Sequence, residues 1–496
     1  MQRIGSLKGT RMRALGRPPG KPKVFPRQAP RVLAAVTLVV ALALPFSGLR
    51  AQNGIQRLPV GAGATGKGPD AIVLKGYEDV PRPPAFTAKT RAEIAEMEKI
   101  VDNYTPQPAW AGQTRAPRPE RSAAYDVQTV AEGLANPWSI SFLPDDRILV
   151  AETARGLRIV DKNGRPGEYI AGLPIDFSKR GQQLMDVIPD KDFARNRVIY
   201  FLYRVPPKEA GDIGKDEEDF PVHYPQIEML GRGKLSPDDK RVTDVKVLLN
   251  TQGIDGRVIQ APDGSLFVDS GPLAGRGILS RNWTQSQLPG SLMGKVLHIN
   301  SDGSIPPDNP FVGRADTRPE IWAFGVRDAQ SIAFDAQGRL WTAESGPMGG
   351  DELNLIQKGK NYGFPTITYG REYTGDLINN GLTAKDGLEQ PIYFWTPSVA
   401  PSGMTFYSGR LFPEWQGDLF IATMSPLFGR KIVRLVLRET PQGMRVVGEE
   451  FLLSGTRFRD VKEGRDGALY VVTDSRPPAG TGPGRDKILR LVPKKR

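Results

Sequence analysis

Three arginines in two distant parts of the sequence are the residues best suited to bind a charged ligand. Arg457 and Arg459 are separated by one residue, and such alternate positions of a β-strand lie on the same face. Two neighbouring guanidinium groups favour a planar anionic partner held by paired hydrogen bonds. Arg327, beside Asp328, would add a third cationic contact, and Asp474 belongs to the same set. The alternative is a ladder of Arg–Asp ion pairs on a surface rim.

Residues 344–354, with the sequence ESGPMGGDELN, have the composition of a loop that could hold a hard cation. Glycine and proline force an irregular backbone whose carbonyl oxygens can point inward, and Ca²⁺ prefers oxygen ligands. Asp351, Glu352 and Asn354 would add side-chain oxygens. The alternative is a tight turn in which the carboxylates cap neighbouring backbone groups.

The composition removes several other kinds of site. The 496 residues include no cysteine, which excludes disulfides, thiolate metal sites and cysteine nucleophiles. Only two histidines, His223 and His298, are available for a metal centre or a Ser-His-Asp relay. The net charge of +12 is concentrated in residues 1–50, which hold ten Lys or Arg and no Asp or Glu. The remainder is nearly neutral, so we expect no nucleic-acid partner.

The N-terminus has the pattern of a signal peptide over residues 1–51. The basic leader is followed by the apolar stretch 32–44 and by a small residue, Ala51, at the expected cleavage site. A helix over this stretch would reach only ~20 Å, whereas a hydrocarbon core is ~30 Å thick, so an uncleaved membrane anchor is the less favoured alternative. We therefore expect a periplasmic or secreted protein that is not stably inserted in a membrane.

Residues 52–123 form a proline-rich segment that differs from the rest of the chain. One helical pattern covers residues 89–101, and the remainder is expected to be an extended arm lying on the main domain. Its end, residues 113–121, has the composition of an exposed linker.

The elements that must position the candidate site form a repeat. Six times, an apolar segment is followed by a polar turn, often containing Asp-Gly, and by a second apolar segment, which is typical of β-hairpins. The six copies span residues 138–150, 185–203, 257–268, 331–342, 402–421 and 459–471. Antiparallel repeats at this spacing predict a propeller. The fold class is therefore all-β, with a six-bladed β-propeller over residues 124–496 and an N-terminal extension.

Further apolar segments complete the predicted blades. Third strands are expected at residues 157–160, 295–299, 431–435 and 487–491. Residues 125–130 can pair with the last of these and close the ring, and the polar stretch 206–244 is expected to be a loop and ribbon of the second blade. A pair of β-sandwiches or a β-helix is the alternative architecture. A propeller binds ligands at one mouth of its central channel, where we expect the candidate residues to meet.

Several motifs resemble the soluble glucose/aldose sugar dehydrogenase family, the glucose/sorbosone dehydrogenases. They are Asn136-Pro-Trp138, residues 294–311, Gly346-Pro347 with residues 351–354, residues 361–365, and Arg457-Phe-Arg-Asp460, in the family's order over about residues 126–492. Members of that family are quinoproteins with a six-bladed propeller, pyrroloquinoline quinone (PQQ) and Ca²⁺. The resemblance implies a periplasmic dehydrogenase that oxidises an aldose or related alcohol, a small-molecule substrate, by hydride transfer to PQQ, with an external electron acceptor.

The resemblance also implies roles for individual residues. The carbonyl oxygens of Gly346 and Pro347 would hold the Ca²⁺ that polarises the quinone, with Asp351 and Glu352 as further candidate ligands. The residues expected around the cofactor's carboxylates and rings are Arg327, Arg457, Arg459 and Asp474.

One family residue is missing. The family's catalytic base is a histidine four residues before the arginine that opens the third repeat, and that position here is Gly253. Asp255, the nearest carboxylate, and Asp328, beside Arg327, are the candidates to accept the proton instead. The alternatives are a propeller with a non-redox activity, as a hydrolase, lyase or isomerase, or a module that binds a ligand without turnover.

Overall fold

The computed structural model describes residues 106–179, 181–206, 227–272, 283–372, 376–425, 429–475 and 484–495, together with the backbone of a short strand, β1 (Ile72–Val73). All of them belong to one compact unit, Leu58–Arg496. The predicted signal peptide, the predicted helix over residues 89–101 and most of the proline-rich segment lie outside the described residues. Among the described residues, no helix combines the length and the apolar character needed to cross a membrane.

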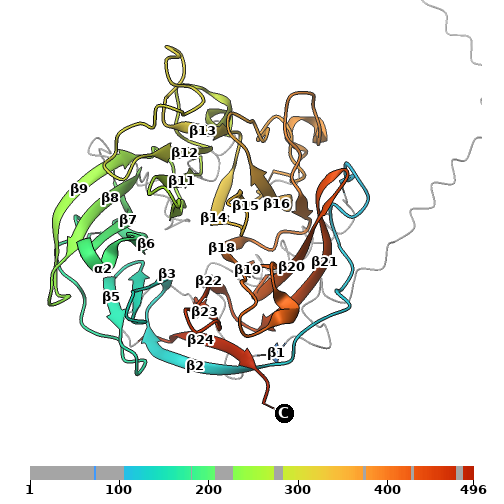
Figure 1. The fold of residues 1–496 in the computed structure, drawn as a ribbon. Helices are drawn as coiled ribbons and strands as arrows, with labels where there is room; N and C mark the ends of the chain where they lie inside the picture. The colour runs from blue at the N-terminus through green and yellow to red at the C-terminus, as the bar shows by residue number, and fades with distance from the viewer. Residues whose placement is uncertain are drawn as a thin grey trace, which may run out of the picture. The chain divides into compact units, whose positions relative to one another are not determined.

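Six antiparallel sheets are arranged in a ring (Figure 1), and we number them as blades 1 to 6. Blade 1 contains β3 (Pro137–Phe142), β4 (Ile148–Glu152) and β5 (Gly156–Val160). Blade 2 contains β6 (Gln183–Pro189), β7 (Val198–Val205), β8 (Ile227–Leu235) and β9 (Val242–Asn250). Blade 3 contains β10 (Val258–Gln260), β11 (Leu266–Ser270), β12 (Lys295–Ile299) and β13 (Ile321–Phe324).

The second half of the ring has the same organisation. Blade 4 contains β14 (Asp328–Phe334), β15 (Leu340–Ser345), β16 (Asp351–Ile356) and β17 (Tyr393–Trp395). Blade 5 contains β18 (Pro401–Phe406), β19 (Leu419–Thr423), β20 (Lys431–Thr440) and β21 (Gly443–Ser454), with β1 parallel to β21. Blade 6 contains β22 (Phe458–Glu463), β23 (Leu469–Thr473), β24 (Asp486–Pro493) and β2 (Tyr125–Leu134). The short helices described are α2 (Phe193–Asn196), η1 (Thr284–Gln287), η2 (Ile378–Gly381) and η3 (Pro413–Trp415).

The predicted six-bladed propeller is confirmed. Each of the six predicted hairpins forms the first two strands of one blade, and the innermost strands β3, β6, β10, β14, β18 and β22 contact one another in that order around the ring. The ring closes as expected, because β2 pairs antiparallel with β24, with Asp126 opposite Val492 and Thr129 opposite Leu489. This pairing joins the beginning of the propeller to its end.

The strands of the blades are continuous apolar segments because neighbouring blades cover both faces of each sheet. Strand β7, with the sequence VIYFLYRV, is buried from Val198 to Arg204. In the cluster between blades 1 and 2, Leu149 and Ala151 pack with Val187 and Phe201. The hydrophobic core is therefore a set of interfaces between blades.

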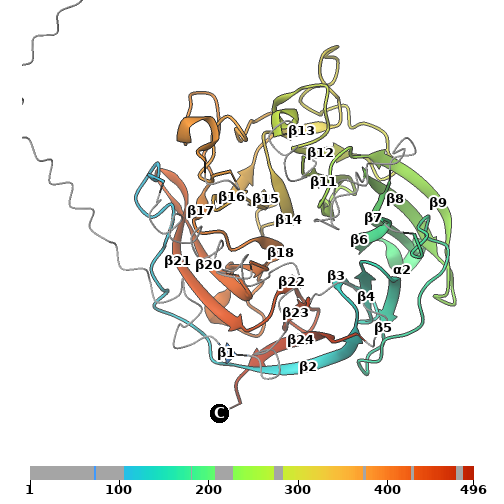
Figure 2. The same ribbon diagram turned by 180° about the vertical axis from the view of Figure 1, so that it is seen from behind.

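Residues 106–124, which we call the arm, run along the outer strands of blades 4 and 5 (Figure 2). The Pro117 carbonyl oxygen accepts a hydrogen bond from the Glu449 backbone N–H at 3.0 Å, and the Arg121 carbonyl oxygen accepts one from Arg434 at 2.6 Å. Gln113 is fully buried against blade 4. Most side chains of residues 113–121 are exposed, as expected, but the segment is not a free linker, because hydrogen bonds hold it to two blades.

Candidate active site

The two ends of the blade strands differ, and we name them separately. In each hairpin the beginning of the first strand pairs with the end of the second, as Asp328 with Ser345 and Phe458 with Thr473. We call this end of the ring the mouth; it includes residues 253–257, 326–330, 345–350, 457–459 and 474. The opposite end, which we call the turn end, holds the hairpin turns at residues 143–147, 190–197, 261–265, 335–339 and 464–468. All of the predicted site residues in the loops lie at the mouth.

The paired arginines meet at the mouth as predicted. The Arg457 and Arg459 guanidinium groups both contact Met424 Sδ, as expected of residues on one face of the chain. Arg459 also lies over the Trp138 ring, with Cζ 3.1 Å from the ring centroid. Arg457 is 3.4 Å from the Asp474 carboxylate. The mouth thus holds two guanidinium groups, of which Arg459 is buried and Arg457 is partly exposed.

Gln330 connects this pair to the third predicted arginine. Arg459 donates to Gln330 Oε1 at 3.0 Å, and the Gln330 amide donates to Asp328 Oδ2 at 3.1 Å. Arg327 Nη1 lies 3.9 Å from Asp328 Oδ2 and also donates to the Ser345 carbonyl oxygen. Burial and the negative charge of nearby Asp255 raise the pKa of Asp328 to about 7. Asp328 is therefore poised to exchange a proton near neutral pH.

Asp255, the other candidate base, has a different environment. Its carboxylate forms an ion pair with Arg204, which also lies 3.9 Å from the fully buried Glu228. Burial raises the pKa of Glu228 to about 8, although Arg204 lowers it. Because Arg204 holds the Asp255 carboxylate in place, Asp255 is better suited to fix the local charges than to accept a proton.

Position 253, which the resemblance aligns with the family's histidine, has no room for a side chain. A Cβ atom at Gly253 would overlap Ser270 Oγ and the Gly271 carbonyl oxygen. The backbone is held there, because the Gly253 carbonyl oxygen accepts the Glu228 N–H at 3.2 Å. A histidine at this position would require the loop to move.

The candidate cation loop contains backbone oxygens that fit a hard cation. Within the described residues, no donor reaches the carbonyl oxygens of Gly346 and Pro347. The loop is compact at this point, because a Cβ atom at Gly346 would lie 2.6 Å from the Gly350 carbonyl oxygen. Neutral carbonyl oxygens that accept no described hydrogen bond are of the type that Ca²⁺ prefers as ligands.

Asp351 organises this loop through hydrogen bonds to its carboxylate. Its Oδ1 accepts the Gly346 N–H at 2.8 Å, and its Oδ2 accepts Ser398 Oγ at 2.9 Å and the N–H groups of Val399 and Ala400 at 2.7 Å each. Three of these donors bind Oδ2 and one binds Oδ1, so the carboxylate caps neighbouring backbone groups, as the alternative expected. Its part as a cation ligand stays a prediction.

Glu352 lies inside blade 4 and not in the loop. It is on β16, directly opposite Glu344 on β15. Burial and the charge of Glu344 raise its pKa well above the usual range. Its role as a cation ligand stays a prediction.

Sequence reasoning missed Arg257, which lies at the centre of the ring. Its guanidinium group contacts all five other innermost strands, through Trp138, Asp186, Gln330, Ser402, Arg459 and Asp460. The side chain is only 2% exposed. Nothing in the local sequence distinguishes this arginine from any other at a strand start, because its partners come from the whole ring. Trp138 and Met424, which contact the paired arginines, were missed as members of the cluster for the same reason.

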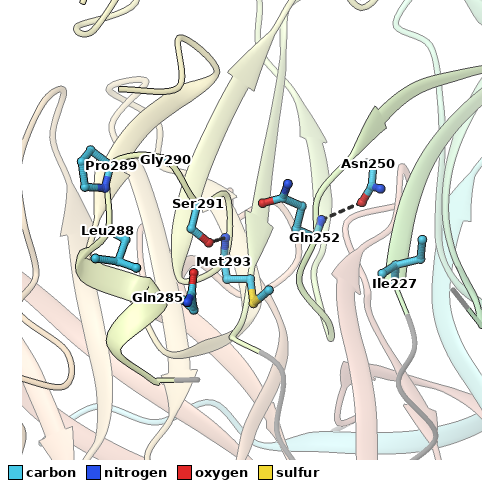
Figure 3. Close-up of a pocket in the computed structure, with 9 residues that line it drawn as sticks. All are labelled: Ile227, Asn250, Gln252, Gln285, Leu288, Pro289, Gly290, Ser291 and Met293. Carbon is cyan, nitrogen blue, oxygen red and sulfur yellow. Dashed lines mark hydrogen bonds between the residues drawn. The ribbon is translucent and has the colours of Figure 1, made fainter. Parts of the chain in front are cut away.

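A cavity of about 600 Å³ lies at the mouth beside Gly253 (Figure 3). Its lining residues are Ile227, Asn250, Gln252, Gln285, Leu288, Pro289, Gly290, Ser291 and Met293, contributed by blade 2 and by the loop before β12. The lining combines amide and hydroxyl groups with apolar side chains and includes no charged side chain. Such a surface suits a neutral ligand with hydroxyl groups.

Comparison with known proteins gives a consistent set of similarities. The family model described as Glucose / Sorbosone dehydrogenase matches residues 134–480. The aldose sugar dehydrogenase YliI of Escherichia coli (strain K12) is 34% identical over 365 residues, which cover 71% of this chain and 91% of the relative. Quinoprotein glucose dehydrogenase B of Acinetobacter calcoaceticus is 26% identical over 429 residues, covering 72% and 86%.

The solved structures extend the similarity to three dimensions. The crystal structure of a glucose dehydrogenase superposes with a TM-score of 0.64 at 34% identity. The superposition covers 74% of this chain and 99% of that chain. The arm begins before the matched residues, so the similarity concerns the propeller and its mouth.

Proposed function

The chain belongs to the glucose/sorbosone dehydrogenase family, and we propose that it is a quinoprotein that oxidises an aldose or a related hydroxyl compound with PQQ and Ca²⁺. The observation that carries the proposal is the cluster of Arg327, Arg457 and Arg459 at the mouth, beside the loop whose Gly346 and Pro347 carbonyl oxygens accept no described hydrogen bond. PQQ is a planar tricarboxylate, so arginines next to an oxygen-lined cation site complement it.

Five residues of the mouth would hold this cofactor and its cation. Arg457 and Arg459 would bind its carboxylates, and Asp474 would keep Arg457 oriented through their ion pair. Gly346 and Pro347 would ligate Ca²⁺. When bound, PQQ would supply the acceptor for a hydride from a substrate C–H bond, with Ca²⁺ polarising its carbonyl group.

We assign the proton transfer to Asp328. Its carboxylate is anchored on one oxygen by the Gln330 amide and lies beside Arg327, whereas Asp255 is held by Arg204. A pKa of about 7 allows Asp328 to accept the proton of a substrate hydroxyl near neutral pH. Arg327 would stabilise the negative charge of the carboxylate before the transfer.

The uncharged cavity beside Gly253 would receive the substrate. Asn250, Gln252, Gln285 and Ser291 offer both donors and acceptors to hydroxyl groups. The names of the relatives, an aldose sugar dehydrogenase and a glucose dehydrogenase, agree with a neutral sugar as ligand. The basic leader and apolar stretch at the N-terminus support export to the periplasm or the medium, where an external acceptor would receive the electrons.

Titration of PQQ into the Ca²⁺-loaded protein, followed by calorimetry, tests this function. We expect saturable binding, and dye-linked oxidation of aldoses that depends on both PQQ and Ca²⁺. The Arg457→Ala variant is the matched control and should lose most of the binding. If the wild-type protein shows no binding, the redox proposal fails and a propeller with non-redox activity becomes the leading account.

A further inference from the structure

The arm lies outside the family match yet reaches the candidate cation loop through Gln113. This residue precedes the matched residues 134–480 and is fully buried. Its side-chain amide donates to the Pro391 carbonyl oxygen at 2.8 Å, and its Oε1 accepts the Ala109 N–H at 2.7 Å. Its backbone oxygen accepts the Phe394 N–H at 3.0 Å. Gln113 is therefore bound on all sides to the arm and to blade 4.

Tyr369 is the partner of Gln113 that leads toward the loop. Its hydroxyl group lies 3.2 Å from Gln113 Oε1 and 2.6 Å from Gln390 Oε1. The Tyr369 ring stacks on Phe394 with a centroid distance of 4.0 Å and an interplanar angle of 13°. Gln113 therefore contacts both members of the stack, Tyr369 through its side chain and Phe394 through its backbone carbonyl oxygen.

The residues that follow Tyr369 pack directly against the candidate cation loop. Met348 and Arg371 exchange backbone hydrogen bonds at 3.1 and 3.3 Å. A Cβ atom at Gly370 would lie 3.0 Å from Pro347 Cδ and would overlap the Gly349 carbonyl oxygen. The Gly350 N–H donates to the Trp395 carbonyl oxygen at 2.7 Å and to Thr396 Oγ1 at 3.0 Å. The segment 369–371 is thus the wall against which residues 347–350 are held.

We propose that Gln113 is a positioning residue for the candidate cation loop, so that docking of the arm sets the geometry of the Gly346 and Pro347 carbonyl oxygens. Gln113 acts through Tyr369 and touches neither cation nor cofactor. The proposal rests on the proposed function for the identity of the cation, but the mechanical coupling from arm to loop stands on the contacts alone. This coupling would give the arm a role in shaping the candidate cation loop, in addition to covering the outer strands of blades 4 and 5.

Hydrogen–deuterium exchange of the full chain, without added ligand, tests the coupling. In Gln113→Ala we expect the amides of Met348 and Gly350 to exchange about three- to tenfold faster, because a lost hydrogen bond loosens the wall that protects them. Trp110→Ala is the matched control: it removes another contact of the arm, the stacking of Arg445 at 4.1 Å, and should leave these amides unchanged.

A second readout separates positioning from general destabilisation. Amide exchange in β7 of blade 2 should be the same in wild type and in Gln113→Ala. In a Ca²⁺ titration followed by the thermal midpoint, Gln113→Ala should need a higher Ca²⁺ concentration than wild type, whereas Trp110→Ala should not. Unchanged exchange at residues 348–350 in Gln113→Ala, or a uniform increase in all blades, would overturn the proposal. Because the exchange experiment needs no ligand, a failure of the wild type to bind PQQ overturns the proposed function and leaves this test intact.

Discussion

Strand β14 carries an aspartate at each end, Asp328 at the mouth and Asp335 at the turn end. Asp335 is also largely buried, which by itself would raise its pKa, but hydrogen bonds from Trp341 and Arg339 outweigh burial and lower the pKa below its usual value. At Asp328, burial and the charge of Asp255 act in the same direction and raise the pKa to about 7. At the two ends of one strand, the pKa of one residue type is therefore shifted in opposite directions.

The same contrast extends around the ring. Turn-end aspartates whose pKa is lowered are Asp145, Asp190, Asp263 and Asp335, and blade 5 is the exception, because burial raises the pKa of Asp418 in its turn to about 7. Carboxyl groups toward the mouth whose pKa is raised to about 7 or 8 are Glu228, Asp328, Glu344 and Asp486. Turn-end carboxylates satisfy local backbone donors and stabilise the hairpins, whereas the mouth concentrates buried carboxyl groups at a cost in stability. Such a cost is expected where the groups serve chemistry.

The largest effect should come from removing the proposed base. In Asp328→Asn we expect kcat to fall by about 10²–10⁴, the usual contribution of a general base, while PQQ affinity stays within a few-fold of wild type. Steady-state kinetics and calorimetry of the two proteins measure this. Asp335→Asn, at the other end of the same strand, is the control and should keep wild-type turnover. Full turnover in Asp328→Asn would contradict the assignment.

Removing Arg257 should reveal how much of the stability of the ring depends on its centre. Arg257→Met leaves the buried carboxylates of Asp186 and Asp460 without their shared cation, which typically costs about 3–5 kcal/mol. Urea unfolding should report a loss in this range. Arg339→Met, at the turn end, removes a partly exposed pair and should cost at most about 1 kcal/mol. Equal losses for the two variants would show that Arg257 has no special role.

The next largest effect should be on cofactor affinity, which we expect to depend on an arginine of the mouth and not on an arginine of the turn end. Each charge-assisted hydrogen bond from Arg457 to a carboxylate contributes about 1.5–3 kcal/mol, so Arg457→Ala should weaken PQQ binding by about 10- to 100-fold or abolish it. Arg339→Ala should bind PQQ like wild type, since Arg339 belongs to the turn end. Calorimetric titration of both variants measures the difference, and comparable affinities would remove Arg457 from the cofactor site.

The sequence predicted the blades well because their signal is local. Each hairpin, such as residues 331–342, contains its own apolar alternation and its own turn, so six copies were recognisable without knowledge of the ring. The grouping of Arg457 with Arg459 was also local, since one strand carries both. Arg257 and Gln330 could not be recognised, because their partners are contributed by other blades and no short-range pattern records them.

Contacts made by Asp351 and by the arm could not be predicted, for the same reason. Three of the four donors to Asp351 come from residues 398–400, which are distant in sequence. The proline-rich composition of residues 113–121 indicated exposure but did not reveal the blade surface to which that segment binds. Spacing therefore identified the loops of the site, whereas roles within them depended on contacts between blades.

The smallest expected effect is also the most direct test of the contrast between the two ends of β14. A carboxyl group with a raised pKa stabilises the folded state below its unfolded pKa, near 3.8, and that contribution is lost as the pH rises through about 7. A carboxyl group with a lowered pKa, such as Asp335, contributes stability above 3.8 that is lost as the pH falls. Relative to wild type, Asp328→Asn should therefore gain stability from pH 4 to pH 7. The stability deficit of Asp335→Asn should stay nearly constant above pH 4 and shrink only as the pH falls below about 3.8. We expect changes on the order of 1 kcal/mol in each window, measured by urea unfolding at several pH values between about 3 and 8. A deficit of Asp335→Asn that changes mainly between pH 4 and pH 7, or an Asp328→Asn variant that gains nothing there, would show that the two pKa values are not shifted in opposite directions.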